Sequence, residues 1–184
     1  MKNIVLIGFM GTGKTCVGQI LARVMGWPFL DLDEEVERSI GMSIAEYFER
    51  YGEDAFRDRE QEAVEKVAAQ SPLVLSTGGG VVLRQINVDR LKETGILVCL
   101  SASVQEILAR TSGDALRPLL NRPDRVEAIQ ELLTARMPRY RLADIWVETD
   151  GKSAEETVEV VLRRLQKEGW WNGNDSSELG REKL

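Results

Sequence analysis

Residues 8–15 of this 184-residue chain, Gly8-Phe9-Met10-Gly11-Thr12-Gly13-Lys14-Thr15, decide its fold. They fit the pattern G-x-x-x-x-G-K-[ST] and lie between an apolar run, NIVLI, and a helical segment, CVGQILARVM. A glycine-rich loop between a buried strand and a helix is the setting in which this pattern encloses nucleotide phosphates. The alternative is a glycine-rich turn that binds nothing.

The residue types in this loop suit a triphosphate. Glycines at 8, 11 and 13 let successive backbone amides point inward at phosphate oxygens. Lys14 adds a fixed positive charge, and the start of the helix adds unpaired N–H groups. The hydroxyl of Thr15 can ligate a Mg²⁺ ion that bridges two phosphates. These features predict a small-molecule kinase that uses ATP and Mg²⁺.

The composition excludes several other classes of function. Acidic residues outnumber basic ones by 30 to 24, which argues against binding to nucleic acid or to a membrane surface. No apolar stretch approaches bilayer length and no signal peptide is evident, so we expect a cytoplasmic protein. Histidine is absent, which removes imidazole bases and serine-type triads. The cysteines, Cys16 and Cys99, are expected to be packing thiols.

The order of apolar runs predicts an α/β fold. Strand-like runs alternate with segments of helical periodicity, and this alternation indicates a five-stranded parallel sheet flanked by helices. The predicted strands are 4–7, 29–32, 73–75, 96–100 and 145–147. Helix starts are marked by Ser-x-x-Glu capping boxes at Ser43, Ser103 and Ser153.

The chain is expected to form one domain, residues 1–168, followed by a polar, poorly ordered tail at 169–184 whose Trp170 and Trp171 can dock on the domain. Residues 53–69 read as one amphipathic helix. A loop rich in Gly, Pro and Arg at 112–124 is a candidate lid.

Polar and glycine-rich segments follow two further strands. Asp31 and Asp33 end the second strand, and Ser76-Thr77-Gly78-Gly79-Gly80 follows the third. Ligands of open parallel sheets bind at the carboxyl ends of strands, so one carboxylate can hold hydrated Mg²⁺ and the other can orient a substrate hydroxyl. The alternatives are that Asp33 only caps the next helix and that the glycines form a flexible turn.

Arginines are candidates for binding an acidic substrate. Arg57 lies on the 53–69 helix, where a solvated surface charge is the alternative. Arg117 and Arg141 lie in or near predicted loops, from which a guanidinium can grip phosphate or carboxylate.

Taken together, the motifs of this chain resemble those of shikimate kinase over residues 1–166. They are the phosphate loop, the D-x-D, Phe56-Arg57 with Glu60, the triple glycine, the R-P-L-L at Arg117 and Tyr140-Arg141. The resemblance implies a P-loop fold of the nucleoside-monophosphate-kinase type, with a lid at 112–124 and a substrate-binding region at 33–62. It implies transfer of the γ-phosphoryl of ATP to the 3-hydroxyl of shikimate, in the chorismate pathway of aromatic amino acid biosynthesis, by a monomer.

The resemblance also implies roles for individual residues. Substrate binding is assigned to Asp33, Arg57, Gly78, Gly79, Gly80 and Arg141. ATP binding is assigned to Gly11, Thr12, Gly13, Lys14, Thr15, Cys16, Arg110 and Arg117. Catalysis is assigned to Lys14, Asp33 and Arg117, and Mg²⁺ to Thr15 and, through water, Asp31. Residues 150–152 depart from the family's adenine-side loop. Two alternative functions remain. One is a kinase of this fold that acts on gluconate or a nucleoside monophosphate, and the other is a nucleotide-dependent switch that binds ATP and transfers no phosphoryl group.

Overall fold

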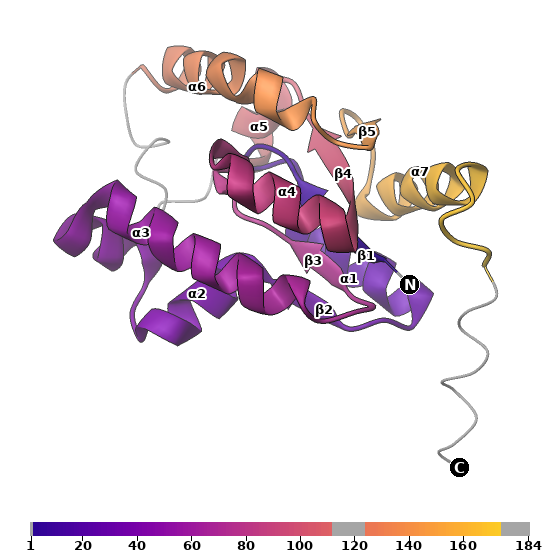
Figure 1. The fold of residues 1–184 in the computed structure, drawn as a ribbon. Helices are drawn as coiled ribbons and strands as arrows, with labels where there is room; N and C mark the ends of the chain where they lie inside the picture. Colours follow the sequence, from indigo (N-terminus) through magenta and orange to yellow (C-terminus); the bar gives the residue numbers. More distant parts are fainter. Residues whose placement is uncertain (1, 112–123, 174–184) are drawn as a thin grey trace.

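The structure, a computed structural model, describes residues 2–111 and 124–173 and contains one parallel sheet (Figure 1). Its strands stand in the order β2-β3-β1-β4-β5, and every neighbouring pair is parallel. Their bounds are Asn3–Ile7 (β1), Phe29–Asp31 (β2), Val74–Ser76 (β3), Gly95–Ser101 (β4) and Ile145–Glu148 (β5). The predicted five-stranded parallel sheet is therefore confirmed.

Helices connect the strands as the alternation of patterns predicted. Their bounds are Lys14–Met25 (α1), Leu32–Ile40 (α2), Ile44–Ala68 (α3), Gln85–Thr94 (α4), Val104–Thr111 (α5), Arg125–Tyr140 (α6) and Ala154–Lys167 (α7), with a short 3₁₀ helix, Val81–Leu83 (η1). The side chains of Ser43, Ser103 and Ser153 each accept a hydrogen bond from the backbone N–H three residues later. At Ser153 the Glu156 carboxylate also accepts a hydrogen bond from the Ser153 backbone N–H, so this site forms a full capping box.

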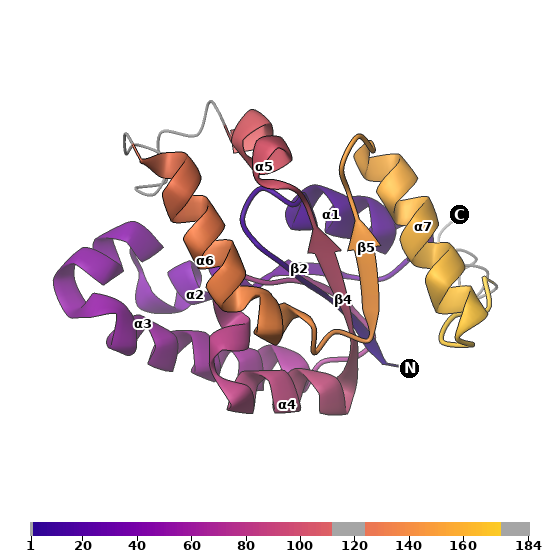
Figure 2. The same ribbon diagram turned by 90° about the horizontal axis from the view of Figure 1, so that it is seen from above.

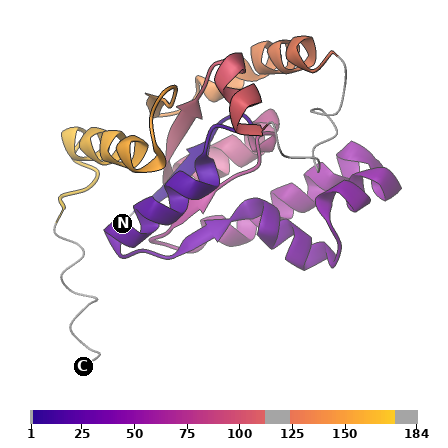
Figure 3. The same cartoon turned by 180° about the vertical axis from the view of Figure 1, so that it is seen from behind.

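The two faces of the sheet bury alternate residues of each strand. Val5 and Ile7 of β1 pack with α3, α4 and α6, whereas Ile4 and Leu6 pack with α1 and α7. Figures 2 and 3 show α1 and α7 together on one face, opposite α4. Because both faces are covered, the strands read as continuous apolar runs, which is what made them visible in the sequence.

The second half of α3 matches the amphipathic helix predicted at 53–69. Gly52 has non-helical backbone angles and divides α3 into two helical parts. After it, the predicted inner residues Phe56, Ala63 and Val64 are buried, but so is Glu60. Burial of a carboxylate was not predicted, and it becomes important at the site.

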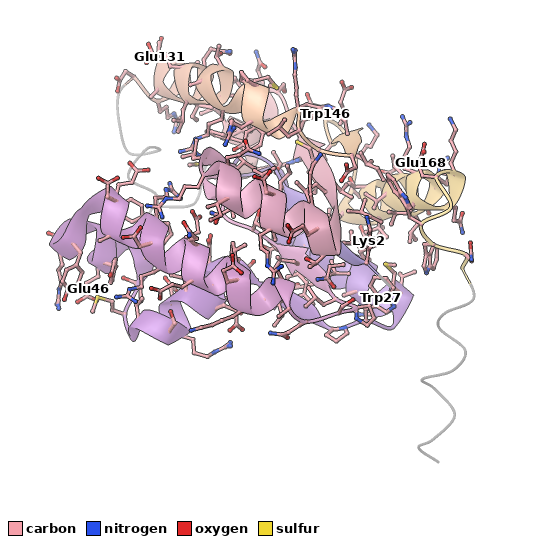
Figure 4. The ribbon with its side chains drawn as sticks, in the orientation of Figure 1. Lys2, Trp27, Glu46, Glu131, Trp146 and Glu168 are labelled. Atoms are coloured by element: carbon pink, nitrogen blue, oxygen red, sulfur yellow. The ribbon has the colours of Figure 1, made fainter. Side chains whose placement is uncertain are left out.

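The end of the described chain is partly packed. Trp171 is 8% exposed and joins Trp27 in the core between α1 and α7, whereas Trp170 is 41% exposed. Figure 4 labels Trp27 at this end of the molecule, Glu131 on α6 and Glu168 at the end of α7. Cys99 is buried as expected, but Cys16 is exposed, so its assignment as a packing thiol was wrong. Residue 174 onward and most of the predicted lid, 112–123, lie outside the described residues. No described helix is long and apolar enough to span a bilayer.

Candidate active site

The phosphate loop connects β1 to α1 and is held tightly by its surroundings. A Cβ on Gly8 would lie 2.2 Å from the carbonyl oxygen of Leu100, so only glycine fits there. Gly13 caps α1 with a φ of 90°, a conformation that side chains disfavour. The first N–H groups of α1 therefore open toward the loop, which is the arrangement that binds anions at helix N-termini.

Lys14 folds back over the loop instead of extending into solvent. Its Nζ donates to the carbonyl oxygen of Phe9 at 2.8 Å, and the residue is 9% exposed. The Thr12 hydroxyl donates to the same carbonyl oxygen, also at 2.8 Å. A nearly buried ammonium ion beside backbone amides provides a strong attraction for phosphate.

Oxygen donors line the first turn of α1 next to the end of β2. Thr15 Oγ1 donates to Asp31 Oδ2 at 2.9 Å and lies 3.4 Å from Ser76 Oγ. Hydroxyl and carboxylate oxygens suit Mg²⁺, which takes few protein ligands and relies on waters and substrate phosphates. This donor set therefore fits the predicted ion. Within the described ranges, no cluster of three or more His, Cys, Asp or Glu residues could hold a metal by itself.

The position of Asp31 tests the alternative that Asp33 only caps the next helix. Asp31 is the N-cap of α2, because its Oδ1 accepts from the backbone N–H of Asp33 at 3.0 Å. Asp33 lies inside the first turn, so the suggestion that it caps this helix was wrong. Its carboxylate lies beside the triple glycine, where a Cβ on Gly78 would be 2.6 Å from Asp33 Oδ1.

Arg57 reaches the same glycine segment from α3. A Cβ on Gly80 would lie 2.4 Å from both terminal nitrogens of the Arg57 guanidinium, so a side chain there would displace it. The Arg57 side chain is 11% exposed and its guanidinium carbon stands 5.1 Å from the centre of the Phe56 ring. The solvated-surface alternative for Arg57 is therefore wrong.

Two glutamates fix Arg57 in this position. Its Nη1 donates to Glu60 at 2.8 Å and its Nη2 donates to Glu53 at 3.0 Å. Burial alone would lower the pKa of Arg57, but these ion pairs raise it above its ordinary value. Burial raises the pKa of Glu60, and Arg57 opposes that shift only in part. The arginine is thus permanently charged and held by a buried partner.

Arg136 on α6 lies beside the same glycine segment, and the sequence analysis did not name it. A Cβ on Gly79 would lie 3.5 Å from Arg136 Nη1 and 3.4 Å from the carbonyl oxygen of Gly8. The Arg136 guanidinium stands over the Phe9 ring, 5.9 Å from its centre, and its buried Nε has no hydrogen-bond partner. Gly79 therefore lies between the phosphate loop and an arginine with unused donor capacity.

Tyr140, one turn after Arg136, attaches α6 to the glycine segment. Its hydroxyl donates to the carbonyl oxygen of Gly79 at 2.7 Å, and burial raises its pKa to about 12. Residues four apart share a helix face, so Arg136 points the same way as Tyr140. Arg141 is the exposed C-cap residue of α6, one position past this face. The geometry favours Arg136 over the predicted Arg141.

The remaining predicted residues lie around this centre. The Arg110 guanidinium donates to the side chain and the carbonyl oxygen of Thr149, at 2.8 and 2.6 Å, and pairs with Glu106. It therefore lies beside the segment 150–152 that follows β5. Cys16 is exposed in the first turn of α1. Arg117 falls outside the described residues.

Comparison with known proteins agrees with this arrangement. The family model for shikimate kinase matches residues 10–166. A shikimate kinase of Thermodesulfovibrio yellowstonii is 46% identical over 91% of this chain and 96% of its own length. A solved shikimate kinase of Acinetobacter baumannii, in complex with shikimate, superposes with a TM-score of 0.87 at 38% identity, covering 91% of this chain and 94% of that one.

The same fold extends to a gluconokinase of Sinorhizobium meliloti, at a TM-score of 0.61 and 22% identity, where the likeness concerns the fold alone. The family model and the relative from Thermodesulfovibrio yellowstonii both span most of the chain. This chain belongs to the shikimate kinase family.

Proposed function

We propose that this protein transfers the γ-phosphoryl group of ATP to the 3-hydroxyl of shikimate, giving shikimate 3-phosphate and ADP in aromatic amino acid biosynthesis. One observation carries the proposal: Asp33, Arg57 and Arg136 converge on Gly78–Gly80, and Gly79 also borders the carbonyl oxygen of Gly8 in the phosphate loop. A small acidic polyol bound at the glycines would thus lie next to the triphosphate. Membership of the family and the solved relative with shikimate support the choice of acceptor.

In this proposal Arg57 and Arg136 grip the substrate carboxylate. A planar guanidinium presents paired donors that match a carboxylate, and both arginines are largely shielded from water, which strengthens the attraction. Gly79 and Gly80 leave room for the substrate ring against the backbone. Arg136 takes the place that the sequence analysis gave to Arg141.

Asp33 orients the reacting hydroxyl by accepting its hydrogen bond. The hydroxyl oxygen forms a bond to the γ-phosphorus as the bond to the β,γ-bridging oxygen breaks, ADP leaves, and the hydroxyl proton passes to the Asp33 carboxylate. Such a transfer depends mainly on alignment and charge stabilisation, which Lys14 and the amides of Gly11–Thr15 supply to the phosphate oxygens. Arg117 is proposed to add a further positive charge, so Arg117→Ala should lower kcat far more than shikimate affinity.

The Mg²⁺ ion is proposed to be held by Thr15 directly and by Asp31 through a water molecule. When bound, the ion would neutralise charge on the β- and γ-phosphates. Arg110 is proposed to lie beside the adenine, where Thr149 and Glu106 fix its guanidinium. We further propose that the enzyme acts as a cytoplasmic monomer.

A coupled ADP-release assay tests the proposal directly. With ATP and Mg²⁺, addition of shikimate should increase ADP release by orders of magnitude, and gluconate or nucleoside monophosphates should not. Faster release with gluconate or a nucleotide acceptor would identify a different kinase of this fold. Slow hydrolysis unaffected by any acceptor would indicate a nucleotide-binding switch.

A further inference from the structure

The last two turns of α6 carry three residues on one face toward the substrate-binding segment. Arg136, Arg139 and Tyr140 are spaced three and four residues apart, so they share a face, and all three are at least partly buried. Ala135, Pro138 and Arg141, between and beyond them, are exposed. Arg136 and Tyr140 reach Gly79, whereas Arg139 reaches a different part of the chain.

Arg139 grips the segment that directly follows the triple glycine. Its Nε donates to the carbonyl oxygen of Val82 at 2.8 Å, its Nη2 to that of Leu83 at 3.3 Å, and its Nη1 to the Gln85 side chain at 2.8 Å. All three nitrogens of the guanidinium therefore have an acceptor. Such a planar set of donors cannot be supplied by any other side chain.

The carbonyl groups that Arg139 binds belong to η1, whose own hydrogen bonds begin at the glycines. The N–H of Val81 donates to the carbonyl oxygen of Gly78, and that of Leu83 donates to the carbonyl oxygen of Gly80. Movement of η1 would therefore move Gly78–Gly80. Carbonyl groups at the end of a short helix need partners from elsewhere, and Arg139 provides them.

The helix that carries Arg136 also needs external support near its end. Pro138 lies inside α6 and has no N–H to donate to the preceding turn, so this part of the helix lacks one of its internal hydrogen bonds. Arg139 and Tyr140, the two residues that follow Pro138, both make contacts outside the helix. They fix the last turns of α6 against the glycine segment.

We infer that Arg139 is a positioning residue for shikimate binding: by fastening α6 to η1 it sets the distance between Arg136 and Gly78–Gly80. The inference rests on the proposed function, because it assumes that Arg136 binds the substrate carboxylate. Arg139 itself donates to protein acceptors and does not contact substrate in this assignment. Its effect should therefore appear in the KM for shikimate and not in the use of ATP.

The test compares steady-state kinetics of Arg139→Met, Arg139→Lys and the wild-type enzyme. We expect Arg139→Met to raise the KM for shikimate about tenfold, with kcat and the KM for ATP changed less than about twofold. Arg139→Lys keeps the charge but offers one nitrogen, so it should restore part of the loss, to about threefold above wild type. Arg163→Met, which removes an exposed arginine of α7, is the matched control and should match wild type.

Two further variants separate positioning from a general loss of stability. Gln85→Ala removes one of the three acceptors of Arg139, together with an exposed hydrogen bond to Asp89, and should raise the KM for shikimate about twofold, even if Arg139→Met folds poorly. In an Arg136→Met background, Arg139→Met should add no further loss, because the group that it positions is already gone.

The outcomes are distinct. An active wild-type enzyme whose KM for shikimate is unchanged in Arg139→Met and Gln85→Ala would overturn the role of Arg139 alone. Parallel increases in both KM values, or full additivity with Arg136→Met, would also overturn it, since they indicate a structural effect. A wild-type enzyme without shikimate-dependent ADP release would overturn the proposed function and, with it, this inference.

Discussion

The phosphate loop and the proposed acceptor site meet at Gly79, but they are built in different ways. The loop uses eight consecutive residues, 8–15, and its binding groups are mainly backbone amides and the end of α1. The proposed acceptor site consists of Asp33, Arg57, Gly78–Gly80 and Arg136, which come from four separate segments and would act mainly through side chains. One site is specified locally and the other by the tertiary fold.

This difference teaches where each site is vulnerable. Backbone amides are fixed as soon as β1 and α1 form, so substitution of Lys14 removes charge from the loop without removing the amides that bind phosphate. In the acceptor site each side chain depends on partners elsewhere, as Arg57 depends on Glu60 and Glu53. Loop substitutions should therefore act on the rate of transfer, and acceptor-site substitutions on shikimate affinity.

The largest effect is expected for Lys14→Met. The substitution keeps most of the side-chain volume but removes the positive charge held over the loop, so kcat should fall about 10³-fold. The KM for shikimate should change less than about threefold. Steady-state assays with each substrate varied in turn measure both quantities, and Lys2→Met, at an exposed residue before β1, is the control. A normal kcat in Lys14→Met would break the division between the two sites.

Arg57→Met should have the next largest effect, on the other substrate. Loss of this guanidinium removes a carboxylate partner and leaves Glu60 buried without its counter-charge, so the KM for shikimate should rise about 100-fold. The KM for ATP should remain close to wild type. Arg59→Met is the matched control, since Arg59 lies two residues along α3, is exposed and pairs with Glu62. Equal effects of the two substitutions would remove Arg57 from the acceptor site.

The pair Arg136→Met and Arg141→Met sharpens the comparison further. The first should raise the KM for shikimate about thirtyfold, because it removes one of two proposed carboxylate partners. The second should leave it within about twofold of wild type, since Arg141 is exposed beyond the face of α6 that meets Gly79. The reverse result would restore the assignment that the sequence favoured.

These arginines also show which parts of the molecule could be predicted. The sheet, the helices and the phosphate loop follow from patterns within about 25 residues, such as apolar runs, capping serines and the glycine spacing. Asp33 and the glycines could be located because parallel strands bring their ends to one edge. The α6 residue that lies beside these glycines, Arg136, could not be deduced in the same way.

Choosing between Arg136 and Arg141 requires the direction in which one face of α6 points. The buried positions Ala128, Ile129 and Tyr140 leave the register of this helix weakly marked in the sequence, and Pro138 interrupts its pattern. The burial of Glu60 was similarly hidden, because a glutamate among charged neighbours on a helix reads as a surface residue. Its contact with Arg57 becomes visible only when α3 is packed against the glycine segment.

Glu60→Gln should have the smallest effect, and one that depends on pH. The pKa of Glu60 is raised above 4.5 by burial. A wild-type enzyme with ionised Glu60 holds Arg57 by charge, whereas the glutamine variant holds it by a neutral hydrogen bond at every pH. At neutral pH the variant should therefore have a KM for shikimate about threefold higher. The ratio of the two KM values should approach one as the pH falls through the pKa of Glu60, and titration of the substrate itself cancels in that ratio.

The same shift has a consequence for stability with a definite sign. Because the folded-state pKa of Glu60 lies above its unfolded value, this group's titration contributes stability that is fully present below about pH 4.5 and is lost as the pH rises through the folded pKa. The free energy of unfolding of wild type, relative to Glu60→Gln, should thus decrease with rising pH across that window, as urea unfolding at several pH values can measure. Glu62→Gln, which alters an exposed ion pair with Arg59 on the same helix, is the matched control. The opposite result would be a free energy of unfolding of wild type that increases with pH relative to that of Glu60→Gln. It would mean that Arg57 stabilises the ionised carboxylate more strongly than burial destabilises it, and that charge holds the buried pair together.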